Sequence, residues 1–465
     1  MANPILLGAL AVLAAGAPPV SGAAPAAQPA ASEPQLKFEK YQLPNGLTVI
    51  LSEDHRLPQV AVDIWYHVGA ANQSPGKSGF AHLFEHMMFS GAKHIGPQPF
   101  KILEGIGTQA GAMANGTTNF DRTNYFEVVP SNELPTALWL ESDRMAFLLD
   151  TLDEKKLKVQ RDVVSNERRQ SYENRPYGTA QLKLCDELYP KPHPYYDCVI
   201  GTIEEIQGAS MDDLKGFFRS FYTPNNASLT IVGDFKPEEV KPIVEKYFGP
   251  IQKGPEVKRP DVPSPTFDKP VEATVDDHNI DAPRLSFVWH GVKPYTDDEA
   301  AGDVLAQLLG TGKTSRLYKT LVFDKQVAAE VEAADVALGL GGFFTIDVTA
   351  NQGHTVAELR PLVQAILDDV RQNGVKPEEV ERAKRNILAG QLRGLERIGG
   401  FGGKADLLNA YQTYTGDPGF LSKDLARYRA VTPEAVKAFA NKYLPDDHRM
   451  VMDVEPAAKT TAAAK

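Results

Sequence analysis

Two histidines and one glutamate lie within five consecutive residues, in the stretch His82-Leu83-Phe84-Glu85-His86. On a helix, His82 and His86 are about one turn apart and point in the same direction, as two ligands of one metal ion must. The order His-x-x-Glu-His is the inverted form of a zinc peptidase motif, in which the glutamate is a general base and not a ligand. The stretch therefore predicts a zinc site with Glu85 as its catalytic base.

The alternative is an amphipathic helix that buries a hydrogen-bonded histidine and binds no metal. The neighbours of the motif are apolar and would bury its polar side chains; they are Ala81, Leu83, Phe84, Met87, Met88 and Phe89. Burying polar groups without partners is costly, whereas a metal ion would satisfy them. The apolar surroundings therefore favour the metal site.

The rest of the chain must form the scaffold that positions this motif. Its length of 465 residues exceeds one ordinary core and predicts two large domains or about three smaller ones. A hydrophobic content of 42% with 23% charged residues is typical of a globular protein. The 49 basic and 60 acidic residues give a net charge of −11 without a basic cluster, so we expect no nucleic-acid partner.

The N-terminus has the pattern of a secretory signal. An apolar run over Ile5–Ala15 is followed by small residues at 21–23, although no Lys or Arg precedes Lys37. A membrane anchor is the alternative, but the run is too short to cross a bilayer, and no later segment is long and apolar enough. We predict a signal peptide at 1–23, a flexible lead-in at 24–36, and an exported, periplasmic protein without a membrane span.

The chain contains two cysteines, Cys185 and Cys198. In an exported protein they could form a disulfide that closes a short loop, which would stabilise the fold by about 3 kcal/mol. A pair of free buried thiols is the alternative, because cysteine is also a common small core residue.

A proline-rich linker at residues 253–269 divides the mature chain into two halves of similar size. The first half, residues 37–252, contains the histidine motif and would be the zinc-binding peptidase domain. The second half, residues 270–456, would be a homologous domain, followed by a disordered tail at 457–465.

The two halves repeat one pattern of elements. Each begins with a strand of period 2, predicted at 59–65 and at 284–289. Each closes with a helix, a tyrosine, a proline and a strand. The closing helices and strands are predicted at 211–222 and 227–233 in the first half and at 432–443 and 449–454 in the second. This repeat predicts an α+β fold of two homologous α/β lobes, each a sheet with packed helices.

The segment from Ser78 to Phe89 resembles, almost residue for residue, the signature of the pitrilysin/insulinase family of zinc peptidases. The resemblance covers nearly all of the mature chain and is strongest to members similar to the mitochondrial processing peptidase. It implies a clam-like dimer and a zinc endopeptidase that hydrolyses short or unfolded peptides enclosed between its lobes.

The family takes its third zinc ligand from a glutamate in a later segment with the pattern R-x-x-V-x-x-E. Residues 161–167 fit this pattern, so the resemblance implies Glu167 as the third ligand, 81 positions beyond His86. The alternative is a solvated carboxylate among neighbouring arginines, because charge runs usually face water. The family also has a glutamate seven residues before this ligand. Here that position is Gln160, which would soften the electrostatics around the ligands without removing the site.

Residues 111–118 resemble the edge strand of the family, along which the substrate peptide lies as an added strand. The resemblance implies that Asn115, Gly116 and Thr117 bind the peptide backbone. Taken alone, the run would also fit a polar edge strand with an asparagine turn.

The second half contains the Ser315-Arg316-Leu317 segment that precedes an arginine and a tyrosine in active relatives. The corresponding positions hold Val322 and Ala329, so these donors to the substrate carbonyl are missing. The resemblance implies that a homologous partner chain supplies Arg and Tyr in a heterodimer, or that the chain alone is a weak enzyme.

Two other functions fit the same fold. Relatives serve as noncatalytic core or assembly subunits of a respiratory complex, and a peptide-enclosing module would need the chamber without the metal. The complete set of His82, Glu85, His86 and Glu167 favours the peptidase, because scaffold relatives commonly lose these residues.

Overall fold

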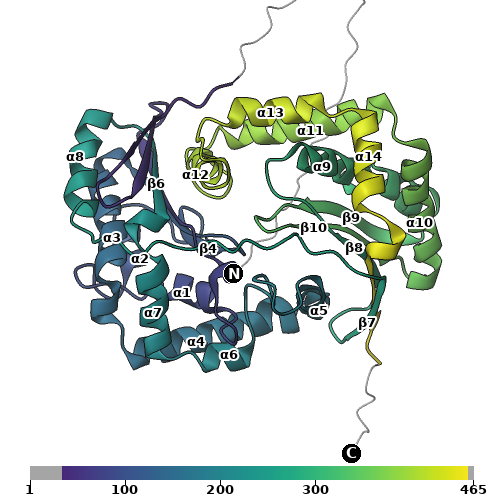
Figure 1. Cartoon of the computed structure of the whole chain (residues 1–465), viewed down its shortest axis with the longest axis horizontal. Coiled ribbons are helices and arrows are strands. Elements are labelled where there is room, and N and C mark those ends of the chain that lie inside the picture. Colours follow the sequence, from purple (N-terminus) through teal and green to yellow (C-terminus); the bar gives the residue numbers. More distant parts are fainter. Residues whose placement is uncertain (1–33, 459–465) are drawn as a thin grey trace, which may run out of the picture. The chain divides into compact units, whose positions relative to one another are not determined.

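The computed structural model describes residues 34–458, and from Gln35 onward they form one compact unit with two β-sheets. The predicted signal peptide, most of the lead-in and most of the tail lie outside the described residues. The predicted α+β class is confirmed, because helices pack against both sheets (Figure 1).

The first sheet has six strands in the order β1-β2-β6-β3-β5-β4. Their bounds are β1 Glu39–Gln42, β2 Thr48–Glu53, β3 Gln59–Tyr66, β4 Ala114–Thr118, β5 Thr123–Pro130 and β6 Ala227–Gly233. The helices of this half are α1 Phe80–Met88, α2 Pro99–Gly105, α3 Leu134–Phe147, α4 Glu154–Arg168, α5 Gly178–Leu188, α6 Ile203–Gln207, α7 Met211–Phe221 and α8 Pro237–Phe248.

The second sheet has five strands in the order β7-β11-β8-β10-β9. Their bounds are β7 Val271–Asp277, β8 Arg284–His290, β9 Ala328–Val336, β10 Phe343–Ala350 and β11 Met450–Pro456. The helices of this half are α9 Asp297–Gly310, α10 Val356–Asn373, α11 Pro377–Gly394, α12 Lys404–Thr415, α13 Leu421–Ala430 and α14 Pro433–Tyr443.

Both sheets are built on the same topology, which confirms the predicted repeat. β2 pairs with β6 in parallel, and β3, β5 and β4 follow in antiparallel order. β7 pairs with β11 in parallel, and β8, β10 and β9 follow in the same antiparallel order. Apart from β1, which extends the first sheet beyond β2, the last strand of each half therefore lies between the first two, and the third strand forms an edge.

The closing helices show how local sequence builds this repeat. Ser210 caps α7 through a reciprocal hydrogen-bonded box with Asp213, and Thr432 caps α14. The buried face of α7 carries Phe217 and Phe218 against the core. The predicted helices and the strands that follow them are confirmed to within two residues.

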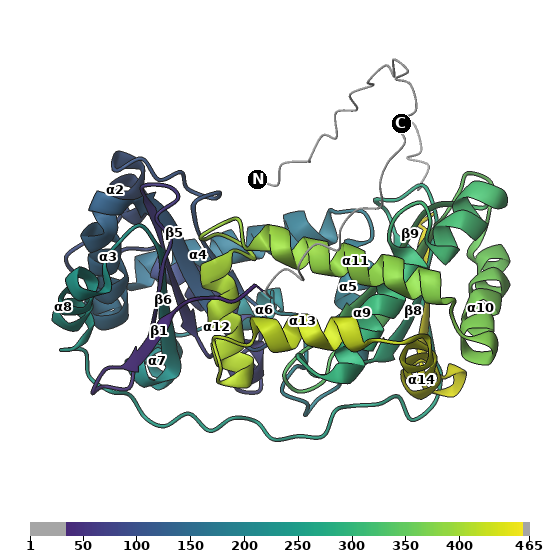
Figure 2. The same cartoon turned by 90° about the horizontal axis from the view of Figure 1, so that it is seen from above.

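α12 lies against β6 and β3 of the first sheet, on the face opposite α3 and α8 (Figures 1 and 2). Asn409 of α12 is fully buried there. Its side-chain oxygen accepts hydrogen bonds from Ser228 and Thr230, and its amide donates to the carbonyl of Asp63. Both faces of β6 are consequently covered, which explains why all of its residues are buried rather than alternate ones.

No helix within residues 34–458 has both the length and the apolar character that crossing a bilayer requires.

Cys185 and Cys198 form a disulfide with a Cα–Cα distance of 5.3 Å, and it joins α5 to the loop that follows. The 13-residue separation makes a small covalent loop next to the segment that precedes α6.

Replacing both cysteines, Cys185→Ala with Cys198→Ala, should lower the free energy of unfolding by about 3 kcal/mol, because the unfolded chain regains the entropy of that loop. Urea denaturation followed by circular dichroism would measure the change. Reducing the unmodified protein with dithiothreitol is the matched control and should produce a similar loss. An unchanged denaturation midpoint in both experiments would contradict the prediction.

Candidate metal centre

α1 carries the histidine motif and is positioned by its apolar face. It begins after Gly79, whose φ of +79° is a left-handed conformation, and a Cβ there would lie 2.7 Å from the carbonyl oxygen of Ile200. Phe84 of the buried face packs on Phe218 and Tyr222, with ring centroids 5.5 and 4.3 Å away. This packing leaves His82 and His86 partly exposed on the other side of the helix.

His82, His86 and Glu167 converge between α1 and α4. The two histidine Nε2 atoms are 3.3 Å apart, and the Glu167 carboxylate lies 3.2 Å from His86 Nε2 and 3.8 Å from His82 Nε2. One ligand atom from each residue lies within 4.8 Å of the others. Three donors from two helices therefore surround one point, although Glu167 is far from the motif in sequence.

The electrostatics of this cluster suit a cation. Burial lowers the pKa of His82 to about 4, so its imidazole is neutral at pH 7. A hydrogen bond from His86 holds the pKa of Glu167 below its usual range, so that this group is an anion. Two neutral nitrogens and one carboxylate form a donor set that zinc prefers, and such a set leaves a further coordination position for water or substrate.

The contact between the two histidines also fits a metal site. Two Nε2 atoms at 3.3 Å can share at most one proton, and a metal ion would use both lone pairs. Nδ1 of His82 is buried and has no hydrogen-bond partner in the described part of the chain, so no protein group fixes its tautomer.

Glu85 lies on α1 but is not part of the cluster of donors. Its side chain is buried, and burial raises its pKa, while a hydrogen bond from Thr118 acts in the opposite direction. The Thr118 hydroxyl donates to Oε2 of Glu85 at 2.7 Å. A carboxylate with a raised pKa beside a metal-binding cluster is suited to accept and return a proton.

β4 passes directly over Glu85 with one side unpaired. It forms the edge of the first sheet, where β5 is its only neighbouring strand; an isolated bridge to Ala110 involves its first residue, Ala114. A Cβ at Gly116 would lie 3.1 Å from Cγ of Glu85, so this position keeps the strand close to the carboxylate. The unpaired edge offers backbone donors and acceptors to an extended peptide.

The other residues predicted for substrate binding lie on the same strand. The Asn115 side-chain oxygen accepts from the N–H of Gly116 at 2.9 Å, and its amide donates to Gly111 at 3.3 Å. The Thr117 hydroxyl contacts Asn124 of β5 and is thus turned toward the sheet. Gly116 therefore lies beside Glu85, Asn115 precedes it on the same edge strand, and Thr117 helps to hold β4 in place.

Gln160 lies two turns before Glu167 on α4. Its amide donates to the hydroxyl of Ser90 at 3.2 Å, just beyond the end of α1. Gln160 therefore links the two helices that carry the cluster.

Sequence reasoning did not assign a role to Thr118 or to the turn after Glu167. In a strand, residues 114, 116 and 118 share one face, so the alternation that places Gly116 over α1 could also have identified Thr118. A π-helical turn, Arg169–Glu173, follows α4 directly after Glu167 and Arg168. Such turns often occur next to functional sites, but no residue pattern here indicated one.

Two family models match this chain. Residues 48–189 match the family described as insulinase, peptidase family M16, and residues 208–387 match the peptidase M16 inactive domain. The zinc protease PqqE of Helicobacter pylori is 29% identical over 367 residues, which are 77% of this chain and 80% of that protein.

Solved structures share the fold. A protease from Helicobacter pylori has a TM-score of 0.83 at 27% identity, covering 90% of this chain and 100% of the other. The first half of the periplasmic protease PqqL from Escherichia coli has a TM-score of 0.73 at 17% identity, covering 91% of this chain and 93% of the other.

If His82, His86 and Glu167 hold one zinc ion, Glu167→Gln should reduce bound zinc well below one per chain, because it removes the anionic donor and leaves the shape of the side chain. Atomic emission on dialysed protein would measure the ratio. Glu154→Gln, at an exposed position of the same helix, is the matched control and should retain the metal. Full zinc content in Glu167→Gln would show that the ligand set is wrong.

Proposed function

The chain belongs to the insulinase family of peptidases, family M16, and on this basis we propose that it is a zinc-dependent endopeptidase that hydrolyses short or unfolded peptides. One observation carries the proposal. The cluster of His82, His86 and Glu167 lies beside a buried Glu85, and an unpaired strand edge passes over this carboxylate.

The residues of this chain would divide the reaction between them. A zinc ion held by His82, His86 and Glu167 would supply Lewis acidity, which polarises the scissile carbonyl and acidifies water. Because Thr118 occupies Oε2 of Glu85, Oε1 is the atom that would accept the proton of the attacking water. Glu85 would then return this proton to the nitrogen of the leaving peptide as the C–N bond breaks.

β4 would bind the substrate as an added strand. Hydrogen bonds from a strand edge address the backbone of a peptide, which favours extended segments over folded ones. The long 3.3 Å bond from the Asn115 amide to Gly111 is the one that a substrate carbonyl could replace most easily.

A noncatalytic assembly or peptide-enclosing subunit is the alternative, and the match to a domain described as inactive favours it. That match covers residues 208–387, however, and these contain none of the four site residues. The first half, which contains all four, matches the insulinase peptidase model.

We propose further that the chain acts in a clam-like heterodimer. Val322 is partly buried against the core of the second half, and Ala329 is exposed at the start of β9. The nearby Arg316 is held by ion pairs with Glu379 and Asp369. Val322 and Ala329 therefore offer no side-chain donor to a substrate carbonyl. A homologous partner chain would supply the missing Arg and Tyr.

The disulfide supports export to the periplasm. Structural disulfides persist in oxidising compartments and are rare in reducing ones. The Cys185–Cys198 bond therefore agrees with the signal-like pattern predicted at residues 1–23, which lie outside the described residues.

Glu85→Gln should bind zinc normally and lose about 10²-fold to 10⁴-fold in peptide turnover, because it removes the base and keeps the ligands. Cleavage of an unstructured fluorogenic peptide, measured beside zinc content, would test this. Normal zinc with unchanged turnover would contradict the proposed mechanism. Zinc-free protein without activity would instead identify Glu85 as a ligand.

Mixing the chain with a homologous chain that carries Arg and Tyr at the equivalents of Val322 and Ala329 should raise turnover by about 10²-fold to 10³-fold, since donors to an oxyanion contribute that much. Zinc content per peptidase chain should not change. The matched control is the same partner with Val and Ala at these two positions, which should not activate. If both partners activate equally, or neither does, the proposal that donors come from a partner is wrong.

A further inference from the structure

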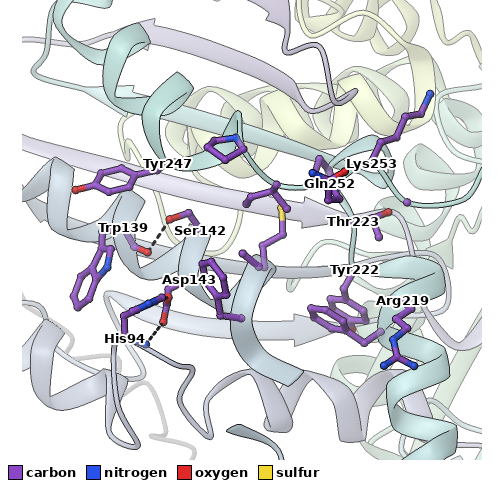
Figure 3. A pocket seen from close by; sticks show the side chains of 18 of the residues that line it. His94, Trp139, Ser142, Asp143, Arg219, Tyr222, Thr223, Tyr247, Gln252 and Lys253 are labelled. Carbon is purple, nitrogen blue, oxygen red and sulfur yellow. Dashed lines mark hydrogen bonds and ion pairs between the residues drawn. The ribbon is translucent and has the colours of Figure 1, made fainter. Parts of the chain in front are cut away.

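A recess lies on the helical side of the first sheet, and none of the donors of the metal centre lines it (Figure 3). It has a volume of about 620 Å³, within the range of small-molecule sites. Residues of α3 and α7, the end of α8 and the segment 250–255 form its walls. Its aromatic lining consists of Trp139, Phe147, Phe218, Tyr222 and Tyr247.

Three cations border this apolar recess: Arg219, Lys246 and Lys253. All three residues are exposed, and none forms an ion pair within residues 34–458. Lys246 lies near the ring of Tyr247, with Nζ 5.2 Å from the centroid. In a chain with a net charge of −11, this border is a local excess of positive charge.

The carboxylate in the lining does not neutralise these cations. Asp143 has a side chain that is 2% exposed, and it accepts hydrogen bonds from the backbone N–H groups of His94 and Ile95. Its second oxygen lies 2.5 Å from Nδ1 of His94, as Figure 3 shows. Asp143 therefore uses both of its oxygens to hold the loop that follows α1. It does not pair with the three cations at the mouth of the recess.

We propose that this recess binds a small apolar carboxylate, an aliphatic or aromatic acid. Its hydrocarbon body would lie against the aromatic walls, and its carboxylate would meet one of the cations at the border, Arg219 or Lys253. Apolar burial would supply most of the affinity, and the charged contacts would select an anion over a neutral or cationic analogue. This binding site is separate from the proposed peptidase centre and does not depend on it.

Binding of dodecanoate to the full-length zinc-loaded protein tests the proposal, with dodecanol and dodecylamine as neutral and cationic analogues. Isothermal titration calorimetry below the critical micelle concentration should show one site that prefers dodecanoate. In the double variant Arg219→Gln with Lys253→Gln, the affinity for dodecanoate should fall about tenfold or more, and the affinity for dodecanol should hardly change. Both positions are exposed, so the variant should fold normally.

Lys101→Gln is the matched control, because this exposed lysine lies on α2 and does not line the recess. It should bind dodecanoate as the unmodified protein does. Ala146→Phe, which places a ring in the recess from α3, should abolish binding with an unchanged circular dichroism spectrum. Equal binding of all three analogues, or an affinity that the double variant does not change, would overturn the proposal. Displacement of a second copy of the chain by dodecanoate, seen by light scattering, would assign the recess to a protein interface instead.

Discussion

Burial of the apolar face of α1 is the constraint on which the metal centre depends. Phe84 packs against Phe218 of α7 and against Tyr222, and on the other side of the helix His82 and His86 face Glu167 of α4. Gly79 permits the turn that starts the helix against Ile200. Hydrophobic packing thus sets the direction of the polar groups, and the donors need no flexible loop to bring them together.

Apolar packing also organises the two halves of the chain. Each sheet has the same strand order, so each half can form a core from its own residues. α12 then fills the remaining face of the first sheet, where Asn409 satisfies hydroxyl groups that its apolar neighbours could not. Asp121 adds a second link, since it accepts from Tyr414 of α12 and from the backbone of Gly339.

Local pattern was sufficient for much of this fold. The spacing of the two histidines predicted the helix that carries them, and strict alternation predicted β3 and β8. Glu167 required the family resemblance, because nothing local distinguishes it from a solvated carboxylate. Thr118, the position of α12 and the recess between α3 and α7 depend on contacts between distant segments. Such contacts have no signature in any short window of sequence, and a single chain offers no covariation from which to infer them.

The repeated topology places β4 and β9 at corresponding edges of the two sheets, opposite the edge strands β1 and β7, and β4 and β9 differ in chemistry. β9 carries the exposed acidic side chains Glu330 and Glu332, which repel another strand that approaches in register. β4, with the sequence Ala-Asn-Gly-Thr-Thr, carries no charge. The charges on β9 thereby oppose pairing of this edge with another copy of the chain. Extended segments, including those of unfolded copies of the chain, would pair instead with the uncharged edge of β4 beside Glu85.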